Sequence, residues 1–418
     1  MSPTPSLTHS AQDPVRDWAR SGVVALTGHP NGPPVIPPGR AATFANEMSS
    51  WIADTCAISG RRIDIDGAKM LSERAAFTGF RRRGNVSAGG SCRLLPTADG
   101  WAAVSCARTT DAALLGALVC EVVDEDNPWP IVADWLAHHR GADLAERATL
   151  LNIAAAPISR ATTPPPAPKP LHPRPVDGLL VVDFSALWAG PLCAHLLGLA
   201  GARVVKVETP DRPDGARRGN SHFYQLLHGG HESVVLDPSR SEGRRALSAL
   251  VDAADIVIEA SRPRALVGFG LDADAAVARG ATWVSITAAG RASDRIGFGD
   301  DLAAAAGLVA TAHDGSPLFV GDAIADPLTG ITAAALVMSA PTDGSGHLWN
   351  LSMSDLVAST LTDHSAPTPR WSGREWIVET ASGVVPVAEP QERAPAGHVA
   401  VSGADTASVL RTLKIAAP

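Results

Sequence analysis

The second half of the sequence alternates between short β-branched runs and longer helical patterns, and this alternation restricts the fold more than any other feature. Strand-like runs fall at residues 179–184, 202–208, 233–237, 255–260 and 283–290, with helical segments between most of them. Such alternation is typical of βαβ units, which build a parallel sheet with helices on both faces. The sequence therefore predicts an α/β, Rossmann-like half over residues 176–362.

The rest of the chain divides at a proline-rich run. Residues 161–175, ATTPPPAPKPLHPRP, predict an extended and fairly stiff linker. Before it, residues 84–160 combine a hairpin pattern around Asp99-Gly100 with helical patterns, which indicates a smaller α+β domain. We expect residues 1–12 to form a disordered tail and residues 363–418, rich in Pro, Ala and Gly, to form a C-terminal extension that closes with a short helix.

Residues 13–83 contain a weak internal repeat of a later segment. The run that begins at Asp17 and the run that begins at Asp301 both pass from a small-residue helix through a Gly and an apolar stretch to a turn. The early copy reads Arg40-Ala41-Ala42-Thr43 where the later one carries its aspartate. We therefore interpret residues 13–83 as a degenerate repeat that packs on the large domain.

Composition argues against several classes of partner. A net charge of −8 and a pI near 5.9 give no electrostatic reason to expect nucleic acid or an anionic membrane. No apolar run approaches the roughly 18 residues of a membrane span, and the first ten residues lack a signal pattern, so a cytoplasmic protein is expected. Five cysteines without CxxC spacing predict neither disulfides nor zinc. His222, His228 and His231 lack an acidic partner at helical spacing, so we expect surface or turn histidines and no metal site.

Parallel strands bind nucleotide-like ligands at their carboxyl ends, which directs attention to the residues that follow each strand. The first such turn, residues 185–191, has one glycine where a dinucleotide motif needs three, and no P-loop motif exists. Glu208 closes the second strand and either accepts a ribose hydroxyl or is a solvated acid. Arg262 and Arg264 follow the run 255–260 and are candidates for phosphate contacts.

One carboxylate, Asp326, stands at the start of a buried helix. Pro327 disfavours the α conformation for Asp326 and suits the first helical position, and the run after it is apolar, so Asp326 is expected to be the N-cap. Two interpretations stay open: an ordinary helix start, which these residues alone favour, and a catalytic nucleophile.

Several stretches together resemble the family III CoA-transferases, the group of formyl-CoA transferases and α-methylacyl-CoA racemases. VVDFSALWAGPLCAHLLGLAGARVVKVETPDRPDG is similar to the opening strand, AGP turn, helix and second strand of that family. HESVVLDPSRSEGRRALSALVDAADIVIEASRPRALVGFGL is similar to the next βαβ segment, and GDAIADPLTG to its Asp-containing turn. The similarity runs from about residue 178 to residue 360.

The resemblance implies roles for individual residues. Asp326 would be the nucleophilic carboxylate. Ala189, Gly190 and Arg262 would lie at the CoA site, with Trp188 beside the pantetheine or thioester. Gly89 and Gly90 in SAGGS would belong to a mobile glycine-rich loop over the active site.

The resemblance also sets the functional expectation, an acyl-CoA:carboxylate CoA-transferase that works through a covalent aspartyl intermediate. Its substrates would be an acyl-CoA and a carboxylic acid, without a metal, in an interlocked homodimer. His231 and Glu232 replace residues that many members use before the next strand, so a CoA-binding relative with impaired catalysis is one alternative. An acyl-CoA racemase or epimerase is a weaker one, because Gly299-Asp300-Asp301 lacks the histidine of the racemases. The Rossmann half follows the small domain, so the order looks permuted.

Overall fold

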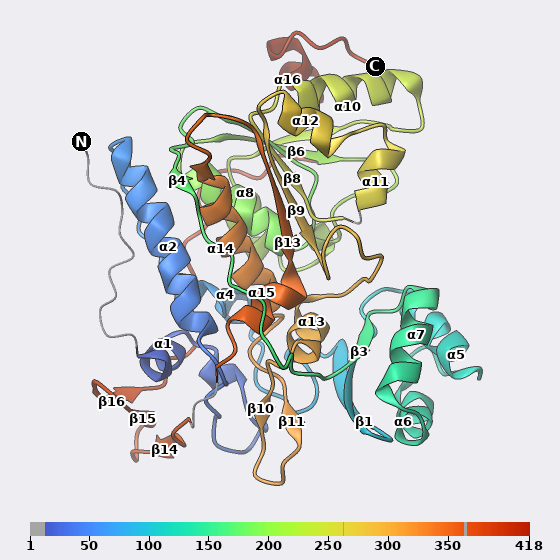
Figure 1. Cartoon of the computed structure of the whole chain (residues 1–418), viewed down its shortest axis with the longest axis vertical. Coiled ribbons are helices and arrows are strands. Elements are labelled where there is room, and N and C mark those ends of the chain that lie inside the picture. The colour runs from blue at the N-terminus through green and yellow to red at the C-terminus, as the bar shows by residue number, and fades with distance from the viewer. Residues whose placement is uncertain (1–12, 262, 363–365) are drawn as a thin grey trace.

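A six-stranded sheet lies at the centre of the computed structural model, which describes residues 13–261, 263–362 and 366–418 (Figure 1). Its strand order is β13-β9-β8-β5-β6-β7, and every neighbouring pair is parallel. The strands are β5 (Leu180–Asp183), β6 (Arg203–Glu208), β7 (Glu232–Val235), β8 (Ile256–Glu259), β9 (Thr282–Thr287) and β13 (His347–Ser352). The predicted α/β, Rossmann-like half is confirmed.

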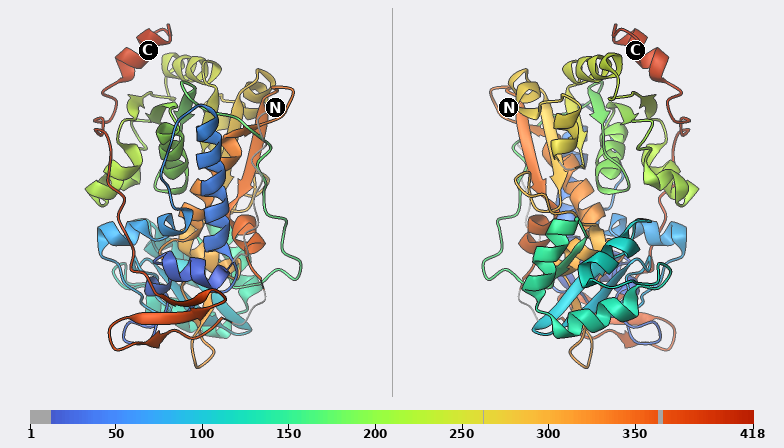
Figure 2. Two further views of the ribbon diagram at one scale, coloured as in Figure 1. Left: turned by 90° about the vertical axis from the view of Figure 1, so that its left-hand side faces the viewer. Right: turned by 90° about the vertical axis from the view of Figure 1, so that its right-hand side faces the viewer.

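Helices cover both faces of this sheet because its strands are apolar on both sides. Successive residues of a strand point to opposite faces. Val181 of β5 therefore joins one hydrophobic cluster, while Leu180 and Val182 join the other. The first cluster is closed by α8 (Ala189–Leu199) and α14 (Ala325–Val337). The second is closed by α10 (Ser241–Asp252), α11 (Pro263–Gly268), α12 (Ala273–Ala278) and α16 (Thr406–Thr412), as Figure 2 shows from two sides.

The strand order contains a switch point beside β5. From β5 the chain proceeds outward to β6 and β7, and it then returns to the other side of β5 for β8, β9 and β13. The connections after β5 and β8 therefore leave in opposite directions, which opens a crevice at the carboxyl ends of these two strands. Two further elements lie between β6 and β7, the short η2 (Gly215–Arg218) and α9 (Ser221–His228).

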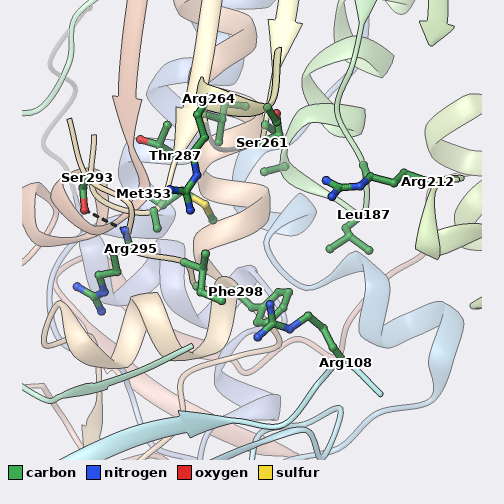
Figure 3. A pocket seen from close by; sticks show the side chains of 18 of the residues that line it. Arg108, Leu187, Arg212, Ser261, Arg264, Thr287, Ser293, Arg295, Phe298 and Met353 are labelled. Atoms are coloured by element: carbon green, nitrogen blue, oxygen red, sulfur yellow. Dashed lines mark hydrogen bonds between the residues drawn. The ribbon is translucent and has the colours of Figure 1, made fainter. Parts of the chain in front are cut away.

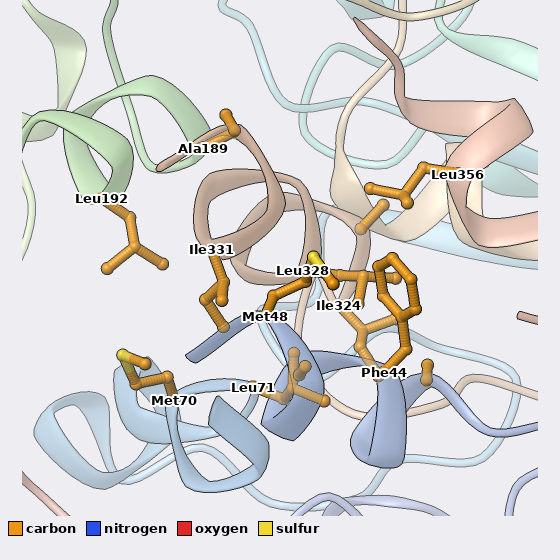
Figure 4. Close-up of a cluster of buried hydrophobic side chains, with 14 of the residues drawn as sticks. Phe44, Met48, Met70, Leu71, Ala189, Leu192, Ile324, Leu328, Ile331 and Leu356 are labelled. Atoms are coloured by element: carbon orange, nitrogen blue, oxygen red, sulfur yellow. The ribbon is translucent and has the colours of Figure 1, made fainter. Parts of the chain in front are cut away.

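Helix α14 is apolar all around, as expected for a helix buried on every side. It lies between α8 and α2 (Ala41–Ile58), and Leu328 and Ile331 are fully buried there (Figure 4). A Cβ at Gly330 would lie 2.6 Å from the Ala189 carbonyl oxygen and 2.9 Å from the Leu192 Cβ. Glycine at this position therefore lets α14 approach α8 closely.

The smaller α+β unit begins with the predicted hairpin. β1 (Cys92–Thr97) and β2 (Gly100–Ser105) are antiparallel and pair Thr97 with Gly100, so the hairpin is confirmed, while its two-residue turn is Ala98-Asp99 and not the expected Asp99-Gly100. A third strand, β3 (Ala155–Pro157), was not predicted, since three residues are too few to show a period. The helices of the unit are α5 (Asp111–Val119), α6 (Trp129–His138) and α7 (Gly141–Leu151).

Residues 13–83 pack against the large unit through α2. Their other elements are α1 (Pro14–Arg20), η1 (Val24–Leu26), α3 (Gly67–Met70) and α4 (Glu73–Thr78). The later segment of the expected repeat contains α13 (Gly299–Ala305), β10 (Ala310–Thr311), β11 (Pro317–Leu318) and α14. Corresponding glycines of the two segments share a positive φ: Gly22 and Gly307, at 78° and 95°, and Gly39 and Gly321, at 76° and 69°. Both segments thus pass from a helix through two glycine turns to a buried helix.

The remaining elements lie at the periphery. β4 (His172–Pro173), within the predicted linker, pairs with β12 (Ser339–Ala340). After α15 (Met353–Ser359), the strands β14 (Arg370–Trp371), β15 (Trp376–Thr380) and β16 (Gly383–Pro386) form a small antiparallel sheet beside α1. The predicted closing helix is α16, which packs against β7.

Candidate active site

The crevice at the carboxyl ends of β5 and β8 is a cavity of about 820 Å³. The turns after the strands supply its walls, including Leu187 after β5, Arg212 after β6, Ser261 after β8 and Ala288 after β9. The small unit adds Arg108 from the loop that follows β2, and Figure 3 shows that side chain beside Phe298. Asp326 also lines the cavity, which is therefore shared by the sheet, the start of α14 and the small unit.

Asp326 is the second residue of α14, and the expectation that it is the N-cap is wrong. The helix begins at Ala325, and the Asp326 N–H donates to the Ala323 carbonyl oxygen at 2.9 Å. The segment turns into the helix already at Ile324, whose backbone is in the α region. Asp326 thus stands in the first turn, where the helix dipole favours its negative charge.

Three aspartates around the start of α14 have raised pKa values. Burial raises the pKa of Asp326 to about 7, even though the nearby Arg74 and the Gly299 N–H favour the charged form. Burial, together with the charge of Asp322, raises the pKa of Asp300 to about 7. Burial raises the pKa of Asp301 to about 6. Shifts of this size through burial and neighbouring charge are found where side chains perform chemistry as well as in structural networks.

Asp300 and Asp301 stand behind Asp326 and are not part of the cavity wall. Asp300 accepts a hydrogen bond from the Ala323 N–H at 2.8 Å. Asp301 accepts from Ser105 Oγ of the small unit and from the Phe298 N–H, each at 2.8 Å. Both carboxylates therefore hold the turns around Asp326 in place.

Arg74 brings a positive charge from residues 13–83 to this acidic group. Its Nη2 and Nε donate to the two carboxylate oxygens of Asp322 at 2.6 Å and 2.8 Å, and Asp322 is fully buried. The guanidinium also lies 4.6 Å from the centre of the Trp188 ring, a cation–π distance. Because Asp322 precedes α14 by one turn, Arg74 fixes the backbone that carries Asp326.

The cavity wall is rich in guanidinium groups. Among the described residues, four arginines line it, namely Arg108, Arg212, Arg264 and Arg295, against two carboxylates, Asp211 and Asp326. Arg264 makes an exposed ion pair with Asp294 at 3.2 Å. In Figure 3 the side chain of Arg212, from the loop after β6, and that of Arg264, from the start of α11, point toward the open middle of the cavity. Guanidinium groups in this arrangement suit phosphate and carboxylate groups.

The structure brings together three of the residues expected at the site, since Asp326, Ala189 and Arg264 all line the cavity. Arg262 lies outside the described residues. Gly190 stands behind the wall, where a Cβ would be 2.1 Å from the Ser185 Cβ, so its glycine is required for packing at the start of α8.

Trp188 and Glu208 are not among the lining residues. Trp188 is buried under Arg74 and meets Phe223 edge-on, with ring centres 5.3 Å apart. The Glu208 carboxylate is buried and occupied by Arg217, by the Asp214 N–H and by Ser402 Oγ. Its position fits neither a solvated acid nor an open ribose acceptor.

Gly89 and Gly90 lie in the turn before β1 and away from the cavity wall. Gly90 has a φ of 86°, and a Cβ there would meet the Arg83 Nη1 at 2.7 Å. Their expected role as an active-site loop remains a prediction.

His222 is exposed as expected, but the other two histidines of the predicted surface group are not. His228 and His231 are buried, not at the surface, and burial beside Lys206 lowers the pKa of both. Their neighbours are Lys206 and Asp214, which form a buried ion pair at 2.8 Å. Among the residues that the structure describes, no group of three or more His, Cys, Asp or Glu side chains is arranged to hold a metal ion.

Residues 108, 212 and 295 were not identified from the sequence. Arg212 follows a strand and had the same positional signal as Arg264. Arg295 lies farther along the loop that follows β9, and Arg108 follows a strand of the small unit, so the strand ends of the large sheet gave no direct signal for either.

The fold and the site define an α/β protein with a basic ligand crevice at a switch point and an acidic helix start in its wall. Residues 176–406 match CoA-transferase family III, which is more than half of the 418 residues, and the chain belongs to this family. The predicted family assignment is confirmed.

Curated relatives match only part of the chain. It is 32% identical over 176 residues to succinyl-CoA–D-citramalate CoA-transferase of Chloroflexus aurantiacus, covering 39% of this chain and 44% of that protein. It is 27% identical over 215 residues to succinate–glutarate CoA-transferase of Agrobacterium fabrum, covering 46% and 54%. The chain thus spans about half the length of these relatives.

A similar solved structure is that of a hypothetical protein from Mycobacterium tuberculosis, with 27% identity, a TM-score of 0.43, and coverage of 51% of this chain and 65% of that one.

Within the described part of the chain, no helix has the length and apolar character needed to cross a bilayer.

Proposed function

We propose that the protein is an acyl-CoA:carboxylate CoA-transferase in which Asp326 is the nucleophile. The observation that carries this proposal is the position of Asp326, a carboxylate in the wall of the basic cavity at the switch point of the sheet. Membership in CoA-transferase family III and the activities in the names of the relatives support it.

CoA would lie across the carboxyl ends of the strands. Arg212 and Arg264 would pair with its phosphate groups, and Ala189 would allow the pantetheine arm to pass toward α14. The names of the relatives contain different acids, so they do not indicate which acid this protein would use.

The reaction divides one exchange into steps of covalent catalysis. The ionised Asp326 attacks the thioester carbonyl, and the C–S bond breaks to give a mixed anhydride and the CoA thiolate. The thiolate attacks the aspartyl carbonyl and releases the first acid as a carboxylate. The acceptor carboxylate attacks the resulting aspartyl-CoA thioester, and the returning thiolate then forms the new acyl-CoA and regenerates Asp326.

The environment of Asp326 affects each step. A pKa of about 7 means that roughly half of the carboxylate is protonated at pH 7, so the nucleophile requires a neutral to basic medium. Burial also removes part of the water around the carboxylate, and the positive dipole end of α14 favours developing oxyanions beside it.

The experiment is a screen of acyl-CoA donors against carboxylic acids, followed by mass spectrometry of the CoA esters formed. The Asp326→Asn variant keeps the shape of the side chain and removes the nucleophile, and Asp211→Asn removes another carboxylate from the same cavity. We expect transfer by the wild type and by Asp211→Asn and none by Asp326→Asn. Undiminished transfer by Asp326→Asn would refute the assignment of the nucleophile.

A further inference from the structure

Arg108 is held rigidly by the small unit and still has one free donor end. The loop that follows β2 wraps around the buried carboxylate of Asp111, which accepts hydrogen bonds from the N–H groups of Ala107 and Arg108 at 2.9 Å and 2.8 Å. The same carboxylate accepts from Arg108 Nε at 2.7 Å, and Arg108 Nη2 donates to the Asn152 carbonyl oxygen at 2.9 Å. Among the described residues, no hydrogen-bond partner is found for Nη1.

The position of Arg108 separates it from the other arginines of the cavity. Arg212 and Arg264 follow β6 and β8 and so belong to the strand ends, where a nucleotide-like ligand lies. Arg108 enters from the small unit, on the other side of the cavity, beside Phe298 (Figure 3). Phe298 immediately precedes α13, whose first residue, Gly299, contacts the carboxylate of Asp326. Arg108 thus lies on the side of the cavity where the transferred acid would sit next to Asp326, and it lies away from the expected path of CoA.

We propose that Arg108 binds a second carboxylate on the transferred acid, so that the enzyme selects dicarboxylic acids. This inference rests on the proposed function. One carboxyl group of the acid reacts at Asp326, and the other accepts hydrogen bonds from Arg108. A guanidinium that is already fixed loses little freedom when it binds. A monocarboxylic acid would place a methyl group there and would not gain the hydrogen bond between two charged groups.

The test compares acids of equal length with one or two carboxylates, namely malonate, succinate and glutarate against propionate, butyrate and valerate. For the wild type we expect higher kcat/KM with the diacids. Arg108→Gln should lower kcat/KM for the diacids by about 10- to 100-fold, the range of a hydrogen bond to a charged group, and leave the monoacids unchanged. Arg140→Gln is the matched control, since Arg140 belongs to the same unit and is exposed.

Equal losses for both series would overturn the inference, because Arg108 would then contact CoA or support the fold. A wild type that prefers monoacids would overturn it as well. A binding measurement separates this inference from the proposed function: succinate should raise the Tm of the wild type more than butyrate does, and this difference should vanish in Arg108→Gln. If succinate raises the Tm more than butyrate but no acid receives CoA, the proposed function fails while the carboxylate site at Arg108 stands. If the two acids raise the Tm equally, the site at Arg108 fails.

Discussion

Replacing Asp326 by Asn should stabilise the protein at neutral pH while it abolishes the proposed activity. The carboxylate has its ordinary pKa of 3.8 in the unfolded chain and a pKa of about 7 in the folded protein. The folded protein therefore keeps this proton up to a higher pH than the unfolded chain does. Its free energy of unfolding falls as pH rises from about 4 to about 7 and is level above that.

The size of the effect follows from the shift. At 1.36 kcal/mol per pH unit, a shift from 3.8 to about 7 corresponds to about 4 kcal/mol at most. The favourable position of the charge at a helix start, worth about 0.5–1 kcal/mol, is smaller than the cost of burial. Access of water from the cavity reduces the net value, so we expect Asp326→Asn to gain about 2–4 kcal/mol at pH 8.

The assay is thermal unfolding between pH 4.5 and pH 8.5. An unfolding entropy of about 2.1 cal/mol/K per residue gives about 0.9 kcal/mol/K for this chain, so the Tm of Asp326→Asn should exceed that of the wild type by about 2–4 °C at pH 8. The two should converge near pH 4.5. Asp211→Asn, which removes an exposed carboxylate, should follow the wild type at every pH. A Tm difference independent of pH, or a wild type more stable at pH 8, would refute the reasoning.

Three further changes test the surroundings of this carboxylate. The kcat/KM for transfer should rise with pH to a plateau above an apparent pKa near 7. Arg74→Gln should move that pKa upward, because Arg74 favours the charged form of Asp326, and Arg74→Lys should restore part of the original pKa. A pH profile that does not move in Arg74→Gln would contradict this role of Arg74. Gly299→Ala should lower kcat sharply in a protein that still folds, because the added Cβ would lie 2.4 Å from Asp326 Oδ2. Full activity of this variant would show that the Asp326 carboxylate does not need the close approach of Gly299. Leu328→Ala should cost about 2–5 kcal/mol of unfolding free energy in urea titration, since the side chain is fully buried in α14; a loss below about 1 kcal/mol would contradict the packing in Figure 4.

Local patterns were sufficient to predict the large sheet. Each of its strands is an apolar run bounded by a turn, and such runs carry their own signal. The signal of the β1–β2 hairpin was also local, although its turn lies one residue before the expected Asp99-Gly100. The strand β3, with three residues, was missed because its structure comes only from pairing with β2.

The site was predictable only where sequence position implies spatial position. Ala189 and Arg264 follow strands, and Asp326 begins an apolar helix, so their approach to one crevice could be inferred. Arg74 and Arg108 come from parts of the chain that precede the large unit, and no local pattern connects them with Asp326. The raised pKa of Asp326 was missed for the same reason, since the burial that causes it comes from contacts distant in sequence.

The central claim is that Asp326 becomes covalently bonded to substrate. The direct measurement is to incubate the protein with an active acyl-CoA donor, trap the intermediate with hydroxylamine, and locate the modified residue by mass spectrometry of peptides. We predict a hydroxamate at position 326 that depends on acyl-CoA and is absent from Asp326→Asn. A donor-dependent adduct on another residue, or an unmodified Asp326 in a preparation that transfers CoA, would contradict the account.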